Sequence, residues 1–163
     1  MIKASKSRPP WFSGGLAITQ QEFFDAVTRK DRRSAQRLPA FFDQCADVGL
    51  SVERADSAMV LYWLDSAHGR VKFGTIFKNG RIDTNHICAM AREVGARQIG
   101  EDYLDGVAAL IDGASALKSG NDMTWRVMKD GQLPEIAEFL DVSREWLELI
   151  EDCMGKFRAL TAD

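Results

Sequence analysis

The chain has 163 residues, of which 45% are hydrophobic and 28% charged, and its formal net charge is −3. This length predicts one domain that folds without disulfides or metals, and no apolar run approaches the roughly 20 residues of a membrane helix, which excludes a membrane partner. The three cysteines, Cys45, Cys88 and Cys153, are widely spaced and odd in number, which favours buried thiols and a reducing, cytoplasmic setting.

Positive charge is concentrated at the N-terminal end. Residues 1–37 contain eight basic and three acidic side chains, a sum of +5, so the rest of the chain has a sum of −8. Residues 1–18 are predicted to form a flexible basic arm, because Pro9-Pro10 favours extended backbone and Gly14-Gly15 favours mobility. A single globular domain is expected over residues 19–163.

Two helices are predicted at the start of this domain. Thr19 and Glu22 have the spacing of a capping box, which indicates a helix beginning near Thr19. A second helix is predicted from about 34 to 48, with a kink or a late start at Pro39. Apolar side chains recur there at helical spacing: Leu38, Phe42, Cys45 and Val48.

An antiparallel meander is predicted next. Residues 50–55 form a weak strand, and residues 58–64 form a strong strand that is apolar on both faces and therefore central. In the following strand one face is expected to contain Val71, Phe73, Thr75 and Phe77. Asn79-Gly80 predicts a two-residue type I′ turn, which would place Phe77 opposite Ile82.

The remaining chain predicts helices and a second, short strand pair. The helices span residues 85–95, with Asn85 as the cap, and residues 100–113. Weak strands follow at 114–118 and 124–128, then a helix with Pro134 at its first position and a long last helix capped by Ser143. Helices and strands occur in separate runs, so the predicted fold class is α+β.

Motifs of catalysis and metal binding are absent from the sequence. It contains no phosphate-binding glycine loop, no G-x-S-x-G and no paired Cys or His spacing of a zinc site. Restriction-type nucleases need D/E-x-K, but residues 70–72 are Arg-Val-Lys. We therefore expect no metal and no cofactor, and favour a protein that is not an enzyme; an enzyme using His86 with Asp83 is the least favoured alternative.

Aromatic side chains are the main candidates for ligand binding. Trp63, Phe73, Phe77 and Trp125 all lie on predicted strands, where they could line a pocket. The alternative interpretation is that the same rings fill the core of the domain.

Several segments together resemble a small bacterial α+β domain family of unknown function, whose members are sometimes joined to restriction-type nuclease segments. The resemblance covers roughly residues 19–155 and depends on five stretches: QEFFDAV, LPAFFDQCADVGL, LYWL, VKFGTIFKNGRIDT and WLELIEDCM. The chain also resembles the orphan proteins of mobile, integron-type gene cassettes. These resemblances imply a bacterial source and supply no catalytic residue.

Three functions follow as hypotheses. The first is a non-enzymatic binding module that recognises a small molecule or a protein partner through its sheet. The second is a nucleic-acid-associated module, which the sequence pI of about 5.5 disfavours; its candidate contacts are Lys3, Lys6, Arg8, Arg32 and Arg33. The third is a homo-oligomer in which the basic N-terminal segment meets the acidic last helix of a neighbour.

Overall fold

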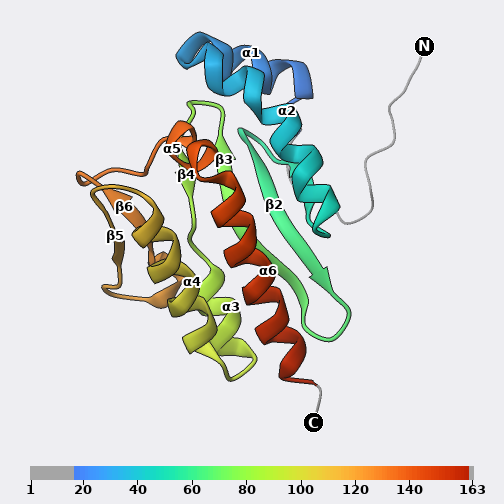
Figure 1. Cartoon of the computed structure of the whole chain (residues 1–163), viewed down its shortest axis with the longest axis vertical. Coiled ribbons are helices and arrows are strands. Elements are labelled where there is room, and N and C mark those ends of the chain that lie inside the picture. Colours follow the sequence, from blue (N-terminus) through green and yellow to red (C-terminus); the bar gives the residue numbers. More distant parts are fainter. Residues whose placement is uncertain (1–16, 162–163) are drawn as a thin grey trace.

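The structure is a computed structural model that describes residues 17–161 (Figure 1). Its helices are α1 (Gln20–Lys30), α2 (Arg32–Asp47), α3 (Ile87–Glu93), α4 (Arg97–Leu110), α5 (Ile136–Asp141) and α6 (Ser143–Ala159), with a short 3-10 helix η2 (Asp122–Thr124). Its strands are β1 (Ser51–Arg54), β2 (Ala58–Asp65), β3 (Gly69–Phe77), β4 (Ile82–Asp83), β5 (Ala114–Leu117) and β6 (Arg126–Lys129). The predicted α+β class and order of elements are confirmed.

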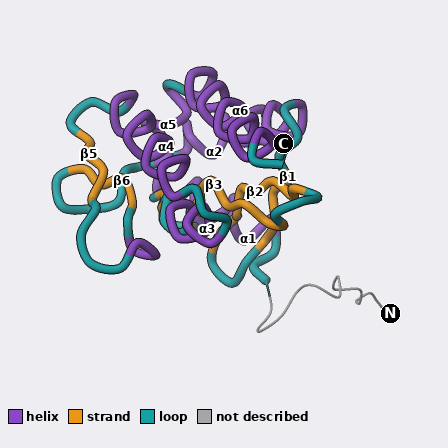
Figure 2. Tube along the Cα trace, turned by 90° about the horizontal axis from the view of Figure 1, so that it is seen from below, coloured by secondary structure: helices purple, strands orange, loops and turns teal. Residues whose placement is uncertain are grey.

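Most of the helices cover one face of the main sheet. Strands β1, β2, β3 and β4 pair in sequence order, all antiparallel, and β5 pairs with β6 in a separate sheet. Figure 2 shows α2, α4, α5 and α6 on one side of the main sheet, whereas α3 follows the edge strand β4 and packs directly against α4. The core lies between the sheet and the helices that cover it, where α6 contributes its predicted stripe: Trp146, Leu147, Ile150, Met154 and Phe157.

The hairpin at Asn79-Gly80 forms, but the predicted turn type was wrong. Ile76 pairs with Ile82, and the Phe77 N–H donates to the Arg81 carbonyl at 2.8 Å, which leaves a three-residue loop. In that loop Gly80 has a positive φ of 84°, as in a type I turn closed by a glycine bulge. The extra loop residue shifts the register by one, so Ile76 rather than Phe77 shares the core with Ile82.

A bulge in β3 corrects a second prediction. Leu61 pairs with Gly74 and Tyr62 with Lys72, so Phe73 is skipped in the register. Beyond this point the two faces of β3 are exchanged. Phe73 is fully buried in the core, whereas Thr75 and Phe77 lie on the opposite face of the sheet, and the four residues predicted to share one face do not.

The bulge is stabilised by a buried hydrogen-bond network. The Tyr103 hydroxyl on α4 donates to the Phe73 carbonyl at 2.9 Å and accepts from the Trp146 indole N–H at 2.8 Å. Burial of that hydroxyl raises the pKa of Tyr103, so it remains protonated and able to donate. One side chain therefore joins β3, α4 and α6 at the point where the strand is irregular.

Helix starts show which capping signals were reliable. The capping box of α1 is present, with Thr19 and Glu22 bonding each other's backbone N–H groups at 3.0 Å. Asp31 caps α2, and Pro39 lies inside that helix. The predicted starts of the later helices were wrong: His86 precedes α3 without a side-chain cap, α5 begins at Ile136 with Glu135 rather than Pro134 before it, and Ser143 is already inside α6.

All three cysteines are buried and free, as the sequence predicts. Burial raises the pKa of Cys45 to about 12, of Cys88 to about 11 and of Cys153 to about 12. The thiols are therefore protonated and unreactive near neutral pH. None of the helices in residues 17–161 is long and apolar enough to cross a membrane.

Most of the predicted N-terminal arm lies outside the described residues. Its last residue, Ile18, is buried and donates its N–H to the Ala55 carbonyl at 2.8 Å. The chain is therefore attached to the β1–β2 turn before α1 begins.

Candidate functional site

The face of the main sheet that is turned away from α6 has a polar character. Because Met59, Leu61 and Trp63 of β2 point into the core, their strand neighbours point to this opposite, open face. The pairings Val60 with Thr75, Tyr62 with Lys72, and Leu64 with Arg70 place the partners on the same face. The open face consists of Ser51, Glu53, Ala58, Val60, Tyr62, Leu64, Arg70, Lys72, Thr75, Phe77 and Asp83.

Two adjoining hollows lie over the open face. One, of about 480 Å³, extends from the β1–β2 turn to the start of α3 and has mostly polar walls, including Glu53, Thr75, Asp83 and Asn85. The other, of about 220 Å³, lies beside α3 and is lined by Ala89, Met90, Arg92, Glu93 and Met123. Arg70, Lys72 and His86 line both hollows. We call the two together the open-face groove.

Arg70 is already engaged in the fold. It contacts Glu53 on β1, with a nitrogen–oxygen distance of 2.5 Å, and its guanidinium lies 4.0 Å from the centre of the Tyr62 ring. Its Nε is buried and has no hydrogen-bond partner among the described residues. Arg70 therefore forms part of the wall of the groove, held there by Glu53 and the Tyr62 ring.

Asp83 forms the floor of the polar end. It is buried on β4, 3.3 Å from Arg126, and accepts a hydrogen bond from the Asn85 N–H at 3.1 Å. Burial raises the pKa of Asp83 above its ordinary value, although Arg126 acts in the opposite direction. Arg126 thus partly offsets the cost of burying the charged carboxyl group.

Lys72 and His86 differ from these neighbours. Both are half-buried and line both hollows, and neither has an ion-pair partner within 4.0 Å among the described residues. Burial lowers the pKa of His86, and the positive charge of Lys72 lowers it further. At neutral pH the groove therefore contains one uncompensated ammonium beside a neutral imidazole.

The backbone at His86 is strained. Its φ is 79° and its ψ is −24°, in the left-handed region that a non-glycine residue rarely adopts. Such conformations cost roughly 1–3 kcal/mol and occur preferentially at functional sites. This geometry turns the chain from β4 into α3 and places the imidazole beside Lys72.

A buried carboxylate fixes the apolar end of the groove. Asp122 in η2 is only 4% exposed, and neither of its oxygens has a hydrogen-bond partner among the described residues. It lies between two arginines, 3.3 Å from Arg92 on α3 and 3.7 Å from Arg97 on α4. This contact holds η2 against α3, so the adjacent Met123 forms part of the groove wall.

The four aromatic residues predicted to bind a ligand do not form one site. Trp63 and Phe73 are buried in the core, whereas Phe77 lines the polar hollow on the open face. Trp125 lies next to β6, where the Arg97 guanidinium is 5.2 Å from its ring centre. Only Phe77 of the four contacts the groove.

The residues predicted to contact nucleic acid are also separate from the groove. Lys3, Lys6 and Arg8 lie outside the described residues, and Arg32 and Arg33 are exposed in the first turn of α2. None of the walls of the groove includes Arg32 or Arg33. Nucleic-acid binding stays an untested prediction.

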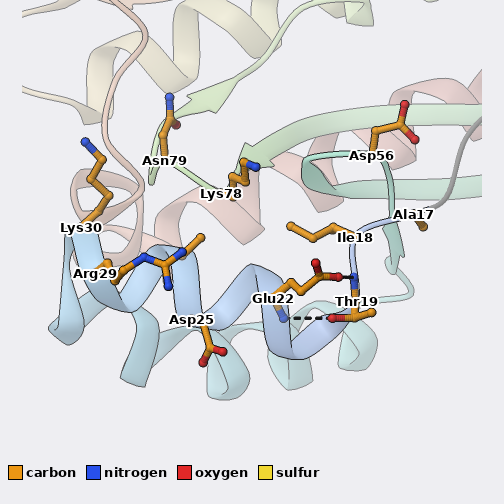
Figure 3. Close-up of a pocket in the computed structure, with 11 residues that line it drawn as sticks. Ala17, Ile18, Thr19, Glu22, Asp25, Arg29, Lys30, Asp56, Lys78 and Asn79 are labelled. Atoms are coloured by element: carbon orange, nitrogen blue, oxygen red, sulfur yellow. Dashed lines mark hydrogen bonds between the residues drawn. The ribbon is translucent and has the colours of Figure 1, made fainter.

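A larger hollow, of about 900 Å³, lies between α1 and the hairpin turn at Lys78 and Asn79 (Figure 3). Three acids and three bases line it: Glu22, Asp25, Asp56, Arg29, Lys30 and Lys78. Glu22 is already used in the cap of α1. Opposite charges are balanced on exposed side chains here, so no charge of ligand is favoured and we consider the open-face groove the better candidate.

The sequence indicated His86 and Asp83 as candidate site residues, but it did not indicate the cations Arg70 and Lys72 beside them. Arg70 and Lys72 alternate with Val71 along β3, a pattern that indicates one polar face of the strand. In the sequence these residues stood out only as a mismatch to the nuclease motif. Among residues 17–161 no group of three or more His, Cys, Asp or Glu side chains is placed to hold a metal ion.

Comparison of the chain with protein-family models, with curated proteins and with solved structures found no match. The resemblance to a bacterial α+β domain family therefore stays a prediction, and the residues of the groove are the basis for considering function.

Proposed function

We propose that this protein is a binding module for a small anionic ligand, which it holds in the open-face groove without catalysing a reaction. The observation that supports this most directly is the pair Lys72 and His86, which both hollows share and which no described acid neutralises. An ammonium and an imidazole N–H are both suited to a carboxylate or phosphate oxygen.

The surroundings of this pair favour binding over catalysis. The nearby charges are compensated, because Arg70 contacts Glu53 and Asp83 contacts Arg126. These ion pairs fix the walls of the groove around Lys72. A preformed, partly desolvated cation is the arrangement expected of a site that recognises a charged small molecule.

Calorimetric titration with sodium acetate and with inorganic phosphate tests the proposal. We expect measurable binding to the wild-type protein and a loss of at least about tenfold in affinity in Lys72→Met, because a charged hydrogen bond contributes about 1.5–3 kcal/mol. His86→Gln is expected to weaken binding less, since the imidazole is neutral at pH 7.

Lys78→Met is the matched control. Lys78 is an exposed lysine of the same hairpin that lines the hollow beside α1 instead of the groove. Its removal is expected to leave the affinity unchanged. Equal affinity of Lys72→Met and wild type, or weakening by Lys78→Met alone, would refute the assignment of the groove.

A further inference from the structure

The two ends of the open-face groove differ in chemistry. Toward the β1–β2 turn the walls are polar, with Glu53, Thr75 and Asp83. Toward α3 the wall contains Ala89, Met90 and Met123, with Arg92 and Glu93 at its rim. Lys72 and His86 lie between the two ends, since they line both hollows.

Met123 is the notable member of the apolar wall. It is 47% exposed, one of four large apolar side chains in residues 17–161 that are exposed to this degree. Its position is fixed by its neighbour, because buried Asp122 holds η2 between Arg92 and Arg97. Methionine adapts its shape to irregular apolar surfaces, so Met90 and Met123 can close around a chain of methylene groups.

The charges beside Lys72 limit the charge of the ligand. Glu53 and Asp83 lie at one end and Glu93 at the other, and only Lys72 among the cations of the groove lacks an acidic partner in the described part of the chain. A doubly charged anion would be repelled by these carboxylates, and the single ammonium of Lys72 would neutralise only one of its two charges. The arrangement therefore favours a single negative charge.

The apolar hollow has room for a short ligand chain. Its volume of about 220 Å³ equals roughly seven times the approximately 30 Å³ that one water molecule occupies in the liquid. A chain of about four to seven carbon atoms therefore fits it.

From these observations we infer that the ligand is a monocarboxylate with a short apolar chain, bound with its carboxylate at Lys72 and His86 and its chain between Met90 and Met123. This inference rests on the proposed function and adds the chemical class of the ligand. The chain would cover apolar surface that Met123 otherwise exposes to water.

Calorimetric titration with the straight-chain series acetate, butanoate and hexanoate tests the inference. We expect affinity to rise with each added methylene by up to about fourfold, the fold-change that corresponds to roughly 0.8 kcal/mol per buried methylene. In Met123→Ser the rise is expected to flatten, while acetate binds as tightly as it does to the wild type.

Leu64→Ser is the matched control, because Leu64 is an exposed apolar residue of the same face, 69% exposed, that lines neither hollow. It is expected to leave the whole series unchanged. Equal affinity for acetate and hexanoate, or tighter binding of inorganic phosphate than of hexanoate, would overturn the inference while the proposed anion site stands. Absence of binding by every anion would overturn both.

Discussion

At the scale of single residues, His86 has a strained backbone conformation and its side chain also lines the groove. It has a φ of 79°, and the other non-glycine residue with positive φ in residues 17–161 is Asp130, with a φ of 53°. Asp130 lies in the turn after β6 and lines no part of the groove. Comparing the two residues therefore distinguishes the free-energy cost of a positive φ from the contribution of the His86 side chain to binding in the groove.

Replacing each of them by glycine makes use of this difference. His86→Gly and Asp130→Gly are both expected to leave the free energy of unfolding unchanged or to raise it by up to about 1 kcal/mol, because glycine adopts this conformation without a steric penalty. Only His86→Gly is expected to weaken anion binding. Urea denaturation and calorimetry measure the two effects; destabilisation by His86→Gly of more than about 1 kcal/mol would show that the imidazole has a structural role.

The lowered pKa of His86 predicts a pH dependence of stability. The groups that face it are Lys72 on β3, Asp83 on β4 and Arg126 on β6. As pH falls below about 6.5 the unfolded chain binds this proton before the folded protein does, so stability is lost as the solution becomes more acidic. The loss levels off once pH is below the pKa of His86 in the folded protein.

His86→Gln isolates this contribution. Relative to His86→Gln, the wild type is expected to lose unfolding free energy as pH falls from 7.5 to 5. Urea denaturation across this range measures it. A difference that does not change with pH would contradict the lowered pKa.

The sequence pattern predicted which residues form the core better than which residues line the groove. The stripe from Trp146 to Phe157 follows from helical spacing, and its members are buried as expected. The positive φ of His86 could not be predicted, because it results from the tertiary path from β4 into α3. Met123 enters the groove only through the contact of Asp122 with two helices, which no local pattern reveals.

At the scale of elements, the position of α3 depends on a glycine in its neighbour. A Cβ atom at Gly100 of α4 would lie 2.7 Å from the Cα of Cys88 in α3. Real contacts of this kind are not that short, so any larger residue would push the helices apart. Since α3 begins next to His86 and contains Met90, this close packing also sets the shape of the groove.

Gly100→Ala is therefore expected to destabilise the fold by about 1–3 kcal/mol through overpacking. The matched variant is Gly155→Ala in α6, where a Cβ would contact nothing within 4 Å. Alanine there is expected to stabilise by about 0.5–1 kcal/mol through helix propensity. Thermal and urea denaturation compare the two, and equal effects would contradict the packing of α3 on α4.

Elements were predictable where their signals were local. The capping box of α1 and the turn-forming glycine of the hairpin act within a few residues, and both are present. The type of that turn and the bulge at Phe73 depend on how strands and core fit together, because Ile76 and Ile82 must both reach the core. Because of these features Thr75 and Phe77 lie on the open face and not in the core as predicted, so the sequence did not indicate that this face is polar.

At the scale of the whole molecule, Tyr103 joins the layers on either side of the core. Its hydroxyl bonds both the Phe73 carbonyl in the sheet and the Trp146 indole in α6. Tyr103→Phe would leave these two buried groups without a partner, so we expect a loss of about 2–4 kcal/mol in unfolding free energy. Tyr62→Phe on the half-exposed open face is the control, and urea denaturation in which both variants lose equally would exclude the network as a stabilising feature.

The most direct test of the anion groove is a crystal structure of the protein soaked with 6-bromohexanoate, with the bromine located by its anomalous signal. We expect the bromine between Met90 and Met123 and the carboxylate at Lys72 and His86. Bromine bound in the hollow beside α1, or absent from the groove at a concentration that saturates binding in solution, would contradict the proposed site.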